Sequence, residues 1–310
     1  MRVLVTGGAG FIGSNLVDAL VARGDEVVVL DDLSTGKREN LEAAGDRARL
    51  IVGSVADYDT VLAAAEGCEL VYHEAAVASV QRTVEAPVET NQVNLGGTLN
   101  VLEAARAVKA RRVVFAGSAA TYGDNPDLPL REDAKPRPQS PYAIEKLASE
   151  QYVKVWADLY GLETVTLRYF NVFGPRQDPG SPYSGVISIF VDRLLRGQVP
   201  TIFGDGEQTR DFVFVSDVVR ANLLAGTVDG VSGRVFNIAG GGPTSLNQLY
   251  GHLRSVIGGA ERPNYAEARA GDIRHSLANI DAAHEGLGYR PGVPVAEGLA
   301  RLVEAVRAAR

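Results

Sequence analysis

The sequence predicts an α/β fold built on a parallel, doubly wound sheet, and two observations support this prediction. Short apolar runs alternate with helix-length segments through the first half of the chain. These runs are apolar at nearly every position, which is typical of strands that helices cover on both faces. Strands that crossover helices join in this way form a parallel sheet.

The predicted elements follow one another in a regular order. The strands are 2–5, 26–30, 49–52, 69–72, 111–116 and 163–170, with a later strand-like run at 234–240. Apolar residues recur at helical spacing between the first two strands, at Ile12, Leu16, Val17, Leu20 and Val21. Further helices are predicted over 141–161, 186–195 and 246–257.

Composition and charge limit the function. With 310 residues, of which 45% are hydrophobic and 22% charged, the chain can bury a large core. Its net charge of −7 argues against nucleic-acid binding. The chain has no apolar run long enough for a membrane span, no signal-peptide pattern, a single cysteine, and four histidines without metal-ligand spacing. We therefore expect a cytoplasmic protein without a metal, a nucleic-acid partner or a membrane partner.

A glycine-rich segment, TGGAGFIG at residues 6–13, follows the first predicted strand and opens the first predicted helix. Here Gly7, Gly10 and Gly13 let the backbone approach a pyrophosphate, whose charge lies at the helix N-terminus. Asp31 ends the second strand, 18 residues after Gly13. A carboxylate there accepts hydrogen bonds from an adenosine ribose and repels a 2′-phosphate. These residues predict a Rossmann-type site for NAD rather than NADP, although Lys37 and Arg38 follow closely.

The composition changes near Gly174, where residues 174–185 crowd Pro, Gly, Ser and Asp into a loop. We predict a Rossmann domain at 1–172 that is completed by about 211–244. The segments 173–210 and 245–310 are predicted to form a smaller, mixed α/β lobe that binds the substrate. A cleft between two such lobes is a common place for a ligand.

A tyrosine and a lysine lie four residues apart in SPYAIEK, residues 140–146, so Tyr142 and Lys146 project from the same face of a helix. Ser140 suits the N-cap of that helix, and Pro141 suits its first position. Ser118 follows the strand 111–116, at the strand end where doubly wound sheets bind ligands. The hydroxyl and the phenol–ammonium pair are therefore predicted to face each other across a nicotinamide.

The charge of Lys146 bears on whether the phenol of Tyr142 can act as a base. Lowering a tyrosine pKa from about 10 by about three units requires roughly 4 kcal/mol of preference for the phenolate. One cation about 5 Å away supplies on the order of 3 kcal/mol at an effective dielectric constant of about 20, and burial opposes this effect. Lys146 alone is therefore insufficient, whereas Lys146 and an oxidised, cationic nicotinamide together can suffice.

The chain resembles the extended short-chain dehydrogenase/reductase family, and within it the bacterial UDP-glucose 4-epimerase group, over essentially its full length. The resemblance rests on TGGAGFIG with Asp31, and on VNLGGT, GSAATYG, SPYAIEK, RYFNVFGPRQDP, GDGEQTRDFVFV and ARAGDIRHS. It implies an NAD-dependent UDP-hexose 4-epimerase. Such an enzyme oxidises C4 of the sugar, lets the 4-keto sugar rotate, and returns the hydride to its other face.

The same resemblance implies roles for individual residues. Tyr142 takes the proton of the sugar 4-hydroxyl, Lys146 holds the nicotinamide ribose and lowers the phenol pKa, and Ser118 hydrogen-bonds the reacting oxygen. The other residues expected at the cofactor are Gly7, Gly10, Phe11, Ile12, Gly13, Asp31, Asp32, Ser54, Val55, Ala75, Ala76, Asn94 and Tyr169. Ser54 stands where the family often has an aspartate.

Substrate contacts are expected from the later motifs. The arginine fork matches the oxygens of a diphosphate, and Arg210 and Arg269 match the diphosphate-binding arginines of the family. The other residues expected at the substrate are Ser118, Asn171, Phe203, Asp272 and Ser276. Galactose-restricted epimerases have a bulky tyrosine at the position of Ser276. The serine implies room for an N-acetyl group, so UDP-GlcNAc and UDP-GalNAc are further candidate substrates.

Single residues argue against three alternative functions. Related dehydratases and decarboxylases typically have acidic residues where this chain has Ala119 and Ala120, which cannot move a proton. A UDP-glucuronate 4-epimerase is disfavoured because Asp178 stands where an arginine is expected to bind the carboxylate. A non-catalytic NAD-sensing regulator usually lacks the tyrosine or the lysine, and both are present here. The resemblance also implies a homodimer, formed through the helix of Tyr142 and the helix before it.

Overall fold

Seven parallel strands form the main sheet of the protein, whose computed structural model describes residues 1–177, 185–268 and 273–308. The strand order is β10–β6–β5–β4–β1–β2–β3. The strands are β1 (Arg2–Thr6), β2 (Glu26–Asp31), β3 (Ala48–Val52), β4 (Leu70–His73), β5 (Arg112–Ser118), β6 (Glu163–Tyr169) and β10 (Arg234–Ile238). All seven predicted strand segments lie in this sheet, which confirms the predicted doubly wound α/β fold.

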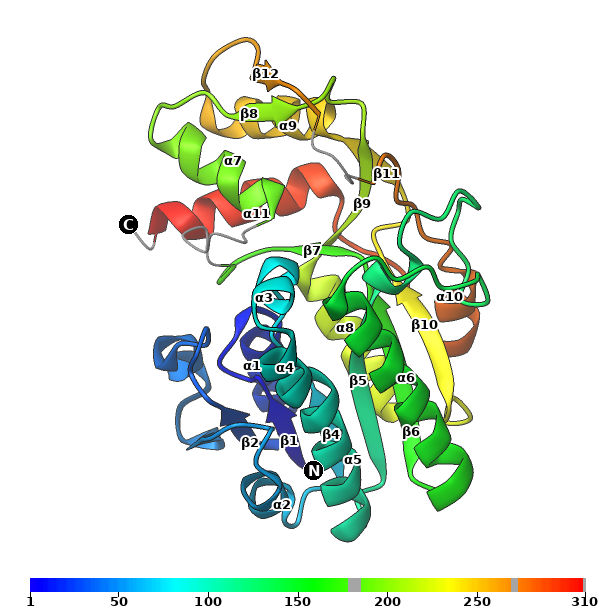
Figure 1. Ribbon diagram of the computed structural model, residues 1–310. Coiled ribbons are helices and arrows are strands. Elements are labelled where there is room, and N and C mark those ends of the chain that lie inside the picture. The colour runs from blue at the N-terminus through cyan, green and yellow to red at the C-terminus, as the bar shows by residue number, and fades with distance from the viewer. Residues whose placement is uncertain (178–184, 269–272, 309–310) are drawn as a thin grey trace.

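Helices cover both faces of this sheet (Figure 1). The helices α2 (Tyr58–Ala65), α5 (Gly97–Ala107) and α6 (Pro141–Tyr160) lie on one face, and α1 (Phe11–Arg23) and α8 (Val215–Thr227) lie on the other. Successive residues of β1 point into two separate cores, because Val3 packs on the α1 side and Leu4 on the α2 side. This double coverage explains the continuous apolar runs. The edge strand β3 is the exception, since Val52 is half exposed.

Short elements fill the connections between these layers. They are η1 (Arg38–Arg47), α3 (Val80–Glu85), α4 (Pro87–Asn91), η2 (Gln92–Gly96), η3 (Ala119–Tyr122) and α10 (Asp281–Leu287). Within the three described ranges, no helix combines the length and the apolar character needed to cross a membrane.

A smaller body lies above the carboxyl edge of the main sheet in Figure 1. It contains α7 (Val186–Leu195), α9 (Leu246–Ile257) and α11 (Val295–Ala308), with a two-stranded sheet of β8 (Thr201–Phe203) and β12 (Asn264–Ala266). Phe173, Phe190, Leu249 and Leu302 belong to its own hydrophobic core. The helices predicted at 186–195 and 246–257 are confirmed as α7 and α9.

A three-stranded sheet joins the two bodies. Its strands are β7 (Asn171–Phe173), β9 (Thr209–Phe214) and β11 (Pro243–Ser245), with β9 in the centre. The sequence analysis did not identify these strands or β8 and β12. Four of the five have only three residues, which is too short for a periodic pattern, whereas β9 has six. The boundaries given for the two predicted lobes remain a prediction.

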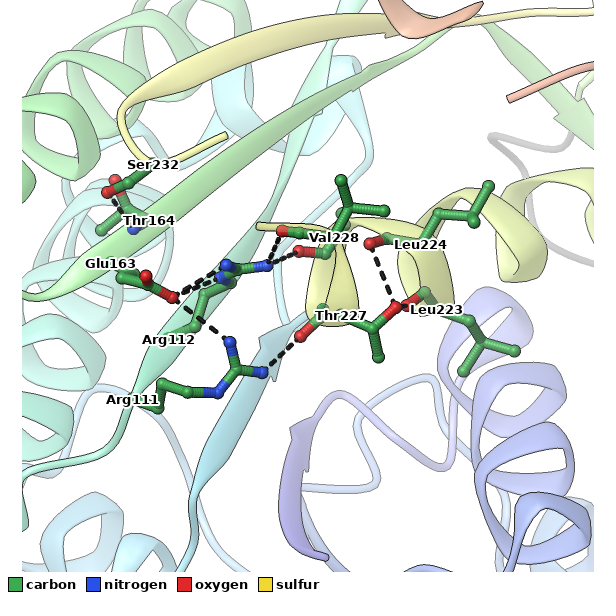
Figure 2. A network of polar contacts seen from close by, with 11 residues as sticks. Arg111, Arg112, Glu163, Thr164, Leu223, Leu224, Thr227, Val228 and Ser232 are labelled. Atoms are coloured by element: carbon green, nitrogen blue, oxygen red, sulfur yellow. Dashed lines mark hydrogen bonds and ion pairs between the residues drawn. The ribbon is translucent and has the colours of Figure 1, made fainter. Parts of the chain in front are cut away.

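Two arginines, Arg112 at the start of β5 and Arg111 just before it, hydrogen-bond the C-terminal end of α8 (Figure 2). This contact lies at the amino edge of the main sheet, opposite the carboxyl edge that faces the smaller body. The fully buried Arg112 donates from Nη1 to the carbonyl oxygens of Ala225 and Val228, each at 2.7 Å. Its Nε donates to Glu163 at the start of β6 at 2.9 Å. Arg111 donates from Nη2 to the Gly226 carbonyl at 2.6 Å. The guanidinium groups thus satisfy carbonyl groups at the C-terminus of α8, which have no partner within the helix.

Candidate active site

The glycine loop between β1 and α1 leaves no space for a side chain at Gly7 or at Gly13. Gly7 has φ +68°, and a Cβ atom there would lie 2.7 Å from the backbone of Ala75. A Cβ atom on Gly13 would lie 2.2 Å from the Gly7 carbonyl oxygen. Gly10 is the N-cap of α1, and its carbonyl oxygen accepts the hydrogen bond from Ser14 N at 3.1 Å. The bare backbone at this helix N-terminus fits a diphosphate.

The side chains of the first two residues of α1 pack against two different hydrophobic cores. Phe11 packs beside the core of the smaller body, and Ile12 packs beside the core of the main sheet. The first turn of α1 therefore contacts both the main sheet and the smaller body.

Asp31 lies at the end of β2 and is 7% exposed. Its Oδ2 accepts a hydrogen bond from Ala9 N at 2.9 Å, and its Oδ1 accepts one from Leu33 N at 2.8 Å. Burial raises the pKa of Asp31, and both backbone hydrogen bonds oppose this shift. Each carboxylate oxygen can accept a further donor, so a ribose contact stays compatible with these bonds. Asp31 therefore also holds the glycine loop in place, whereas Asp32 is exposed and accepts a hydrogen bond from Ser34 N.

The segments that follow β3 and β4 bring the other predicted cofactor residues to the same edge of the sheet. Ser54 Oγ accepts a hydrogen bond from Ala56 N at 3.2 Å, and Val55 is buried against Gly97. Ala75 and Ala76 are half-buried.

Asn94 is 2% exposed, and its amide joins two parts of the chain. The Oδ1 atom accepts from Val77 N at 2.7 Å, and Nδ2 donates to Val77 O at 3.2 Å and to Glu145 Oε2 at 2.6 Å. Asn94 thus fixes the segment after β4 against helix α6. A direct contact of this residue with the cofactor stays a prediction.

Ser118 and Tyr142 meet at the carboxyl edge of the sheet, as the sequence predicted. Ser118 ends β5, and its side chain lies beside the Tyr142 phenol, whose pKa it lowers. Its Oγ also accepts from Ala120 N at 3.2 Å. Ser140 Oγ accepts from Ala143 N at 3.2 Å, so the predicted N-cap and the start of α6 at Pro141 are confirmed. This cap fixes the turn of helix that carries the phenol.

Lys146 lies one helical turn after Tyr142 and is 4% exposed. Its Nζ donates to Ala116 O at 2.9 Å and lies 4.9 Å from the centre of the Phe115 ring. Burial lowers the pKa of Lys146 to about 8, although the nearby carboxyl groups of Glu74 and Glu145 oppose this shift.

The pKa of Tyr142 is raised, chiefly because the phenol is removed from water. The hydrogen bond from Ser118 lowers this pKa, and the charge of Glu145 raises it further. The protein's own groups therefore keep the phenol protonated near neutral pH. Ionisation of Tyr142 therefore requires positive charge beside it, and the contribution of Lys146 to this charge stays a prediction.

Tyr169, predicted at the cofactor, belongs to a buried polar network. Its hydroxyl donates to Glu74 Oε1 at 2.7 Å and accepts from Asn222 Nδ2 at 2.7 Å. Burial raises the pKa of Glu74 to about 7, and hydrogen bonds from Tyr169 and Asn222 together with the charge of Lys146 oppose this shift. The sequence analysis missed Glu74, Asn222 and Glu145. The position of Glu74 directly after a strand was the one available signal, because ligands gather at strand ends in such sheets.

The predicted substrate residues lie on the small sheets above the main one. Asn171 starts β7, which pairs with β9, the strand of Arg210. Ser276 N donates to Thr209 O at 3.1 Å, which places Ser276 beside the same strand. Phe203 ends β8, and its carbonyl oxygen accepts from Gln208 Nε2 at 2.6 Å. The structure thus brings Asn171, Arg210 and Ser276 together, whereas the predicted residues Arg269 and Asp272, like Asp178, lie outside the described residues.

No metal site is visible among residues 1–177, 185–268 and 273–308, since no three His, Cys, Asp or Glu side chains there are grouped so as to hold an ion. His73 is buried between Thr6 and Thr98, at 2.7 and 3.1 Å from their hydroxyl oxygens. Burial and the Lys146 charge lower the pKa of His73 to about 3, so this imidazole stays neutral.

These features define a class of protein. The bare glycine loop and the carboxyl group at the end of β2 fit a dinucleotide, and the Ser118–Tyr142–Lys146 set lies where its nicotinamide end is expected. A hydroxyl, a phenol and an ammonium group are suited to proton transfer at a C–O bond beside a hydride acceptor. The site is therefore that of a dinucleotide-dependent enzyme acting on an alcohol or carbonyl carbon.

Comparisons with known proteins give the family. The model of the "NAD dependent epimerase/dehydratase family" matches residues 3–239. The UDP-glucose 4-epimerase of Mycolicibacterium smegmatis is 43% identical over 99% of each chain. The chain belongs to this family, within the extended short-chain dehydrogenase/reductases, and is an NAD-dependent epimerase. The predictions of an enzyme and of NAD as cofactor are thereby confirmed.

Two solved structures cover the whole chain. The UDP-glucose 4-epimerase of Thermotoga maritima with UDP-glucose is 42% identical, with a TM-score of 0.94 over 100% of this chain and 99% of that chain. The UDP-N-acetylglucosamine 4-epimerase of Methanobrevibacter ruminantium, in complex with UDP-N-acetylmuramic acid, is 38% identical, with a TM-score of 0.95 over the same shares. The smaller body is therefore shared with these epimerases as well as the main sheet.

Proposed function

We propose that the protein is a UDP-hexose 4-epimerase that interconverts UDP-glucose and UDP-galactose and also accepts UDP-GlcNAc and UDP-GalNAc. The observation that carries this proposal is that Ser118, at the end of β5, lies beside the phenol of Tyr142, in the first turn of α6, at the edge of the sheet that carries the glycine loop. Similar epimerases bind UDP-glucose and a UDP-N-acetylated sugar, which supports the class of substrate.

The side chains have separate tasks in this reaction. When bound, NAD accepts the hydride from C4 of the sugar and gives it back. The Tyr142 phenolate takes the proton of the 4-hydroxyl group at its Oη, and it returns the proton when the carbonyl group is reduced. The Ser118 hydroxyl hydrogen-bonds the same sugar oxygen and keeps it beside the phenol. Lys146 supplies part of the positive charge that keeps the phenolate ionised.

The residues after Ser118 favour epimerisation over elimination or decarboxylation. Ala119 and Ala120 lie in the η3 turn that directly follows β5. Neither side chain can donate or accept a proton, and reversible oxidation at C4 needs no further acid or base than Tyr142. This argument separates the proposed function from that of dehydratases with the same fold.

The three-stranded sheet of β7, β9 and β11, which carries Arg210, is suited to bind the rest of the substrate. We assign the diphosphate to Arg210 on β9, together with Arg269, because a guanidinium group matches phosphate oxygens. Ser276, half-buried beside Thr209, leaves room for an acetamido group at C2 of the sugar. Asn171 and Phe203 are assigned to the sugar nucleotide as well, on the basis of the motif resemblance.

We also propose a homodimer. The outer faces of neighbouring helices α3, α4 and α6 expose large apolar side chains, which a partner subunit would bury. These are Val80, Val84, Val88, Ile144, Tyr152, Val155, Leu159 and Tyr160, each between 40% and 74% exposed. On α6 the spacing of residues 144, 152, 155 and 159 corresponds to one helix face.

A substrate panel tests the proposed activity. The protein is incubated separately with UDP-glucose, UDP-GlcNAc and UDP-glucuronate, and the products are separated by chromatography. We expect the first two to be converted to their C4 epimers. Conversion of UDP-glucuronate alone would replace the proposal by a glucuronate epimerase. If no substrate were converted and no 4-keto sugar formed, a non-catalytic NAD-binding regulator would be favoured instead.

A further inference from the structure

Asp211 is a fully buried carboxyl group in β9, and it directly follows Arg210, to which we assign the diphosphate. Both of its oxygens accept hydrogen bonds from backbone N–H groups. The Oδ1 atom accepts from Gly240 N at 2.9 Å and from Gly241 N at 3.1 Å, and Oδ2 accepts from Ala278 N at 3.2 Å. One side chain thus holds two segments, which are distant from each other in the sequence, against β9.

The first of these segments is the turn between β10 and β11. A Cβ atom on Gly240 would lie 2.2 Å from the Phe212 carbonyl oxygen, and Gly241 has φ +79°. Two successive N–H groups that converge on one oxygen form an anion-binding nest, and the anion in this nest is a carboxylate of the protein itself. The turn leads into β11, in which Thr244 lies opposite Arg210.

The second segment, residues 274–278, is named here the Ser276 segment. It runs parallel to the start of β9, and Ser276 N donates to Thr209 O at 3.1 Å. Asp211 and its partner Ala278 lie two residues further along the two strands. The backbone of Thr209 and the side chain of Asp211 therefore fix the position of Ser276 beside β9.

The Asp211 carboxyl group is ionised when activity is measured at about pH 8. Burial raises its pKa to about 6, and the hydrogen bonds from Ala278, Gly240 and Gly241 oppose this shift. A carboxylate has two acceptor oxygens and can accept all three N–H groups, whereas a neutral amide has only one oxygen. Loss of the second oxygen would leave a donor such as the buried Ala278 N–H without a partner.

We propose that Asp211 is a positioning residue of the substrate site, whose carboxylate fixes Arg210 and the Ser276 segment relative to each other. This inference rests on the proposed function, because it takes Arg210 and Ser276 as substrate residues. Asp211 is buried and acts through these neighbours. Its loss should therefore weaken substrate binding, whereas Ser118 and Tyr142 lie on elements of the main sheet and its helices and stay in place.

The substitution Asp211→Asn tests this inference, because asparagine keeps the shape of the side chain and replaces one acceptor oxygen by a donor. We expect the KM for UDP-glucose to rise about tenfold and kcat to stay unchanged, as for the loss of an interaction that serves binding alone. The amount of NAD that copurifies with the protein should equal that of the wild type.

Asp217→Asn is the matched control. Asp217, in the first turn of α8, is buried in the same way, and its carboxyl oxygens accept from Gly292 N at 2.9 Å and from Val293 N at 3.1 Å. Neither of these two backbone donors belongs to a residue assigned to the cofactor or the substrate. We expect Asp217→Asn to lower the thermal stability but to keep the KM of the wild type. An equal rise of KM in both variants would overturn the inference, because a purely structural loss would then explain it.

A second variant tests the same contact without changing the carboxylate. Ala278→Pro removes the N–H group that Asp211 Oδ2 accepts and leaves the turn between β10 and β11 bound. The neighbouring hydrogen bonds to Leu130 use Leu277 O and Asn279 N, so they are kept. We expect the KM for UDP-glucose to rise in this variant too, and this result decides the test if Asp211→Asn does not fold.

Calorimetric titration with UDP measures binding without turnover. We expect the Kd of UDP to be about tenfold higher in Asp211→Asn and unchanged in Asp217→Asn. If the wild type, Asp211→Asn and Ala278→Pro bind UDP equally, the inference is wrong, even when the protein epimerises UDP-sugars. Weaker UDP binding in a protein that converts none of the UDP-sugars would support the role of Asp211 and refute the proposed activity. A wild type that does not bind UDP would overturn both.

Discussion

At the scale of single residues, the ionisation of Tyr142 depends on opposing effects of its surroundings. Burial and the charge of Glu145 raise the pKa of Tyr142, whereas the hydrogen bond from Ser118 lowers it. Burial lowers the pKa of Lys146 to about 8, and its Nζ donates a hydrogen bond to Ala116 O. We expect the positive charge that a phenolate needs to come from Lys146 and the cationic form of the cofactor together. This arrangement would couple proton removal to the oxidised state of NAD.

The substitution Tyr142→Phe tests this role. It removes the phenol oxygen and preserves the ring, so we expect turnover of UDP-glucose to fall by about 10²- to 10⁴-fold, the usual contribution of a general base. Bound NAD, measured after release from the denatured protein, should be unchanged. Tyr58→Phe, at the start of α2, is the matched control and should retain full activity. A Tyr142→Phe variant as fast as the wild type would refute the assignment.

At the scale of elements, the cofactor loop depends on close packing between β1, α1 and the segment after β4. The Cβ positions of Gly7 and Gly13 are occupied by backbone atoms of Ala75 and Gly7. The sequence pattern showed where glycines recur, whereas these contacts show which of them cannot be replaced.

Gly13→Ala should displace the loop, because the added methyl group would lie 2.2 Å from the Gly7 carbonyl oxygen. We expect NAD binding to weaken at least about tenfold, which corresponds to a loss of about 1.4 kcal/mol of binding free energy. Titration of the cofactor-depleted protein with NAD measures this loss. Gly251→Ala in α9, where no heavy atom lies within 4 Å of the added group, should bind NAD normally. Equal affinities of the two variants would contradict the prediction.

The contact between α8 and the sheet gives a prediction of stability. Arg112→Leu removes a fully buried guanidinium group that binds Glu163, the Ala225 carbonyl oxygen in α8 and the Val228 carbonyl oxygen directly after α8. We expect the free energy of unfolding to fall by about 2–4 kcal/mol, since the carbonyl groups lose buried charged donors. Arg111→Leu affects a side chain that is 40% exposed, so its cost should be about 1 kcal/mol or less. Urea unfolding of both variants distinguishes the two costs, and similar losses would contradict the argument.

At the scale of the whole molecule, the apolar faces of α3, α4 and α6 predict how two subunits associate. Val155→Glu places a charge within this surface and should convert a dimer to a monomer at micromolar concentration. Ile189→Glu on α7 is the matched control, because Val155 and Ile189 are 40% and 39% exposed. Sedimentation velocity measures the outcome. A wild-type monomer, or a Val155→Glu variant that stays dimeric, would overturn the proposed interface.

The sequence alone was sufficient to predict the main sheet, the glycine loop and the position of Ser118 near the helix that carries Tyr142 and Lys146. Strands covered on both faces are apolar throughout, and a cap such as Ser140 acts within one helical turn, so both leave a local signal in the chain. The four strands of three residues left no such signal, and β9, with six residues, was not identified either. They depend on pairing between distant segments, such as Asn171 of β7 with Phe212 of β9.

Residue patterns determined which groups are available for chemistry, and the tertiary structure decided their surroundings. Tyr142 and Lys146 are four residues apart in any helix, but burial shifts the pKa of each. The pKa of Lys146 also depends on Glu74, which lies 72 positions before it in the chain. Sequence spacing contains no information about such distant neighbours. Desolvation and Coulomb interactions depend on distance in space, so they are decided only when the chain has folded.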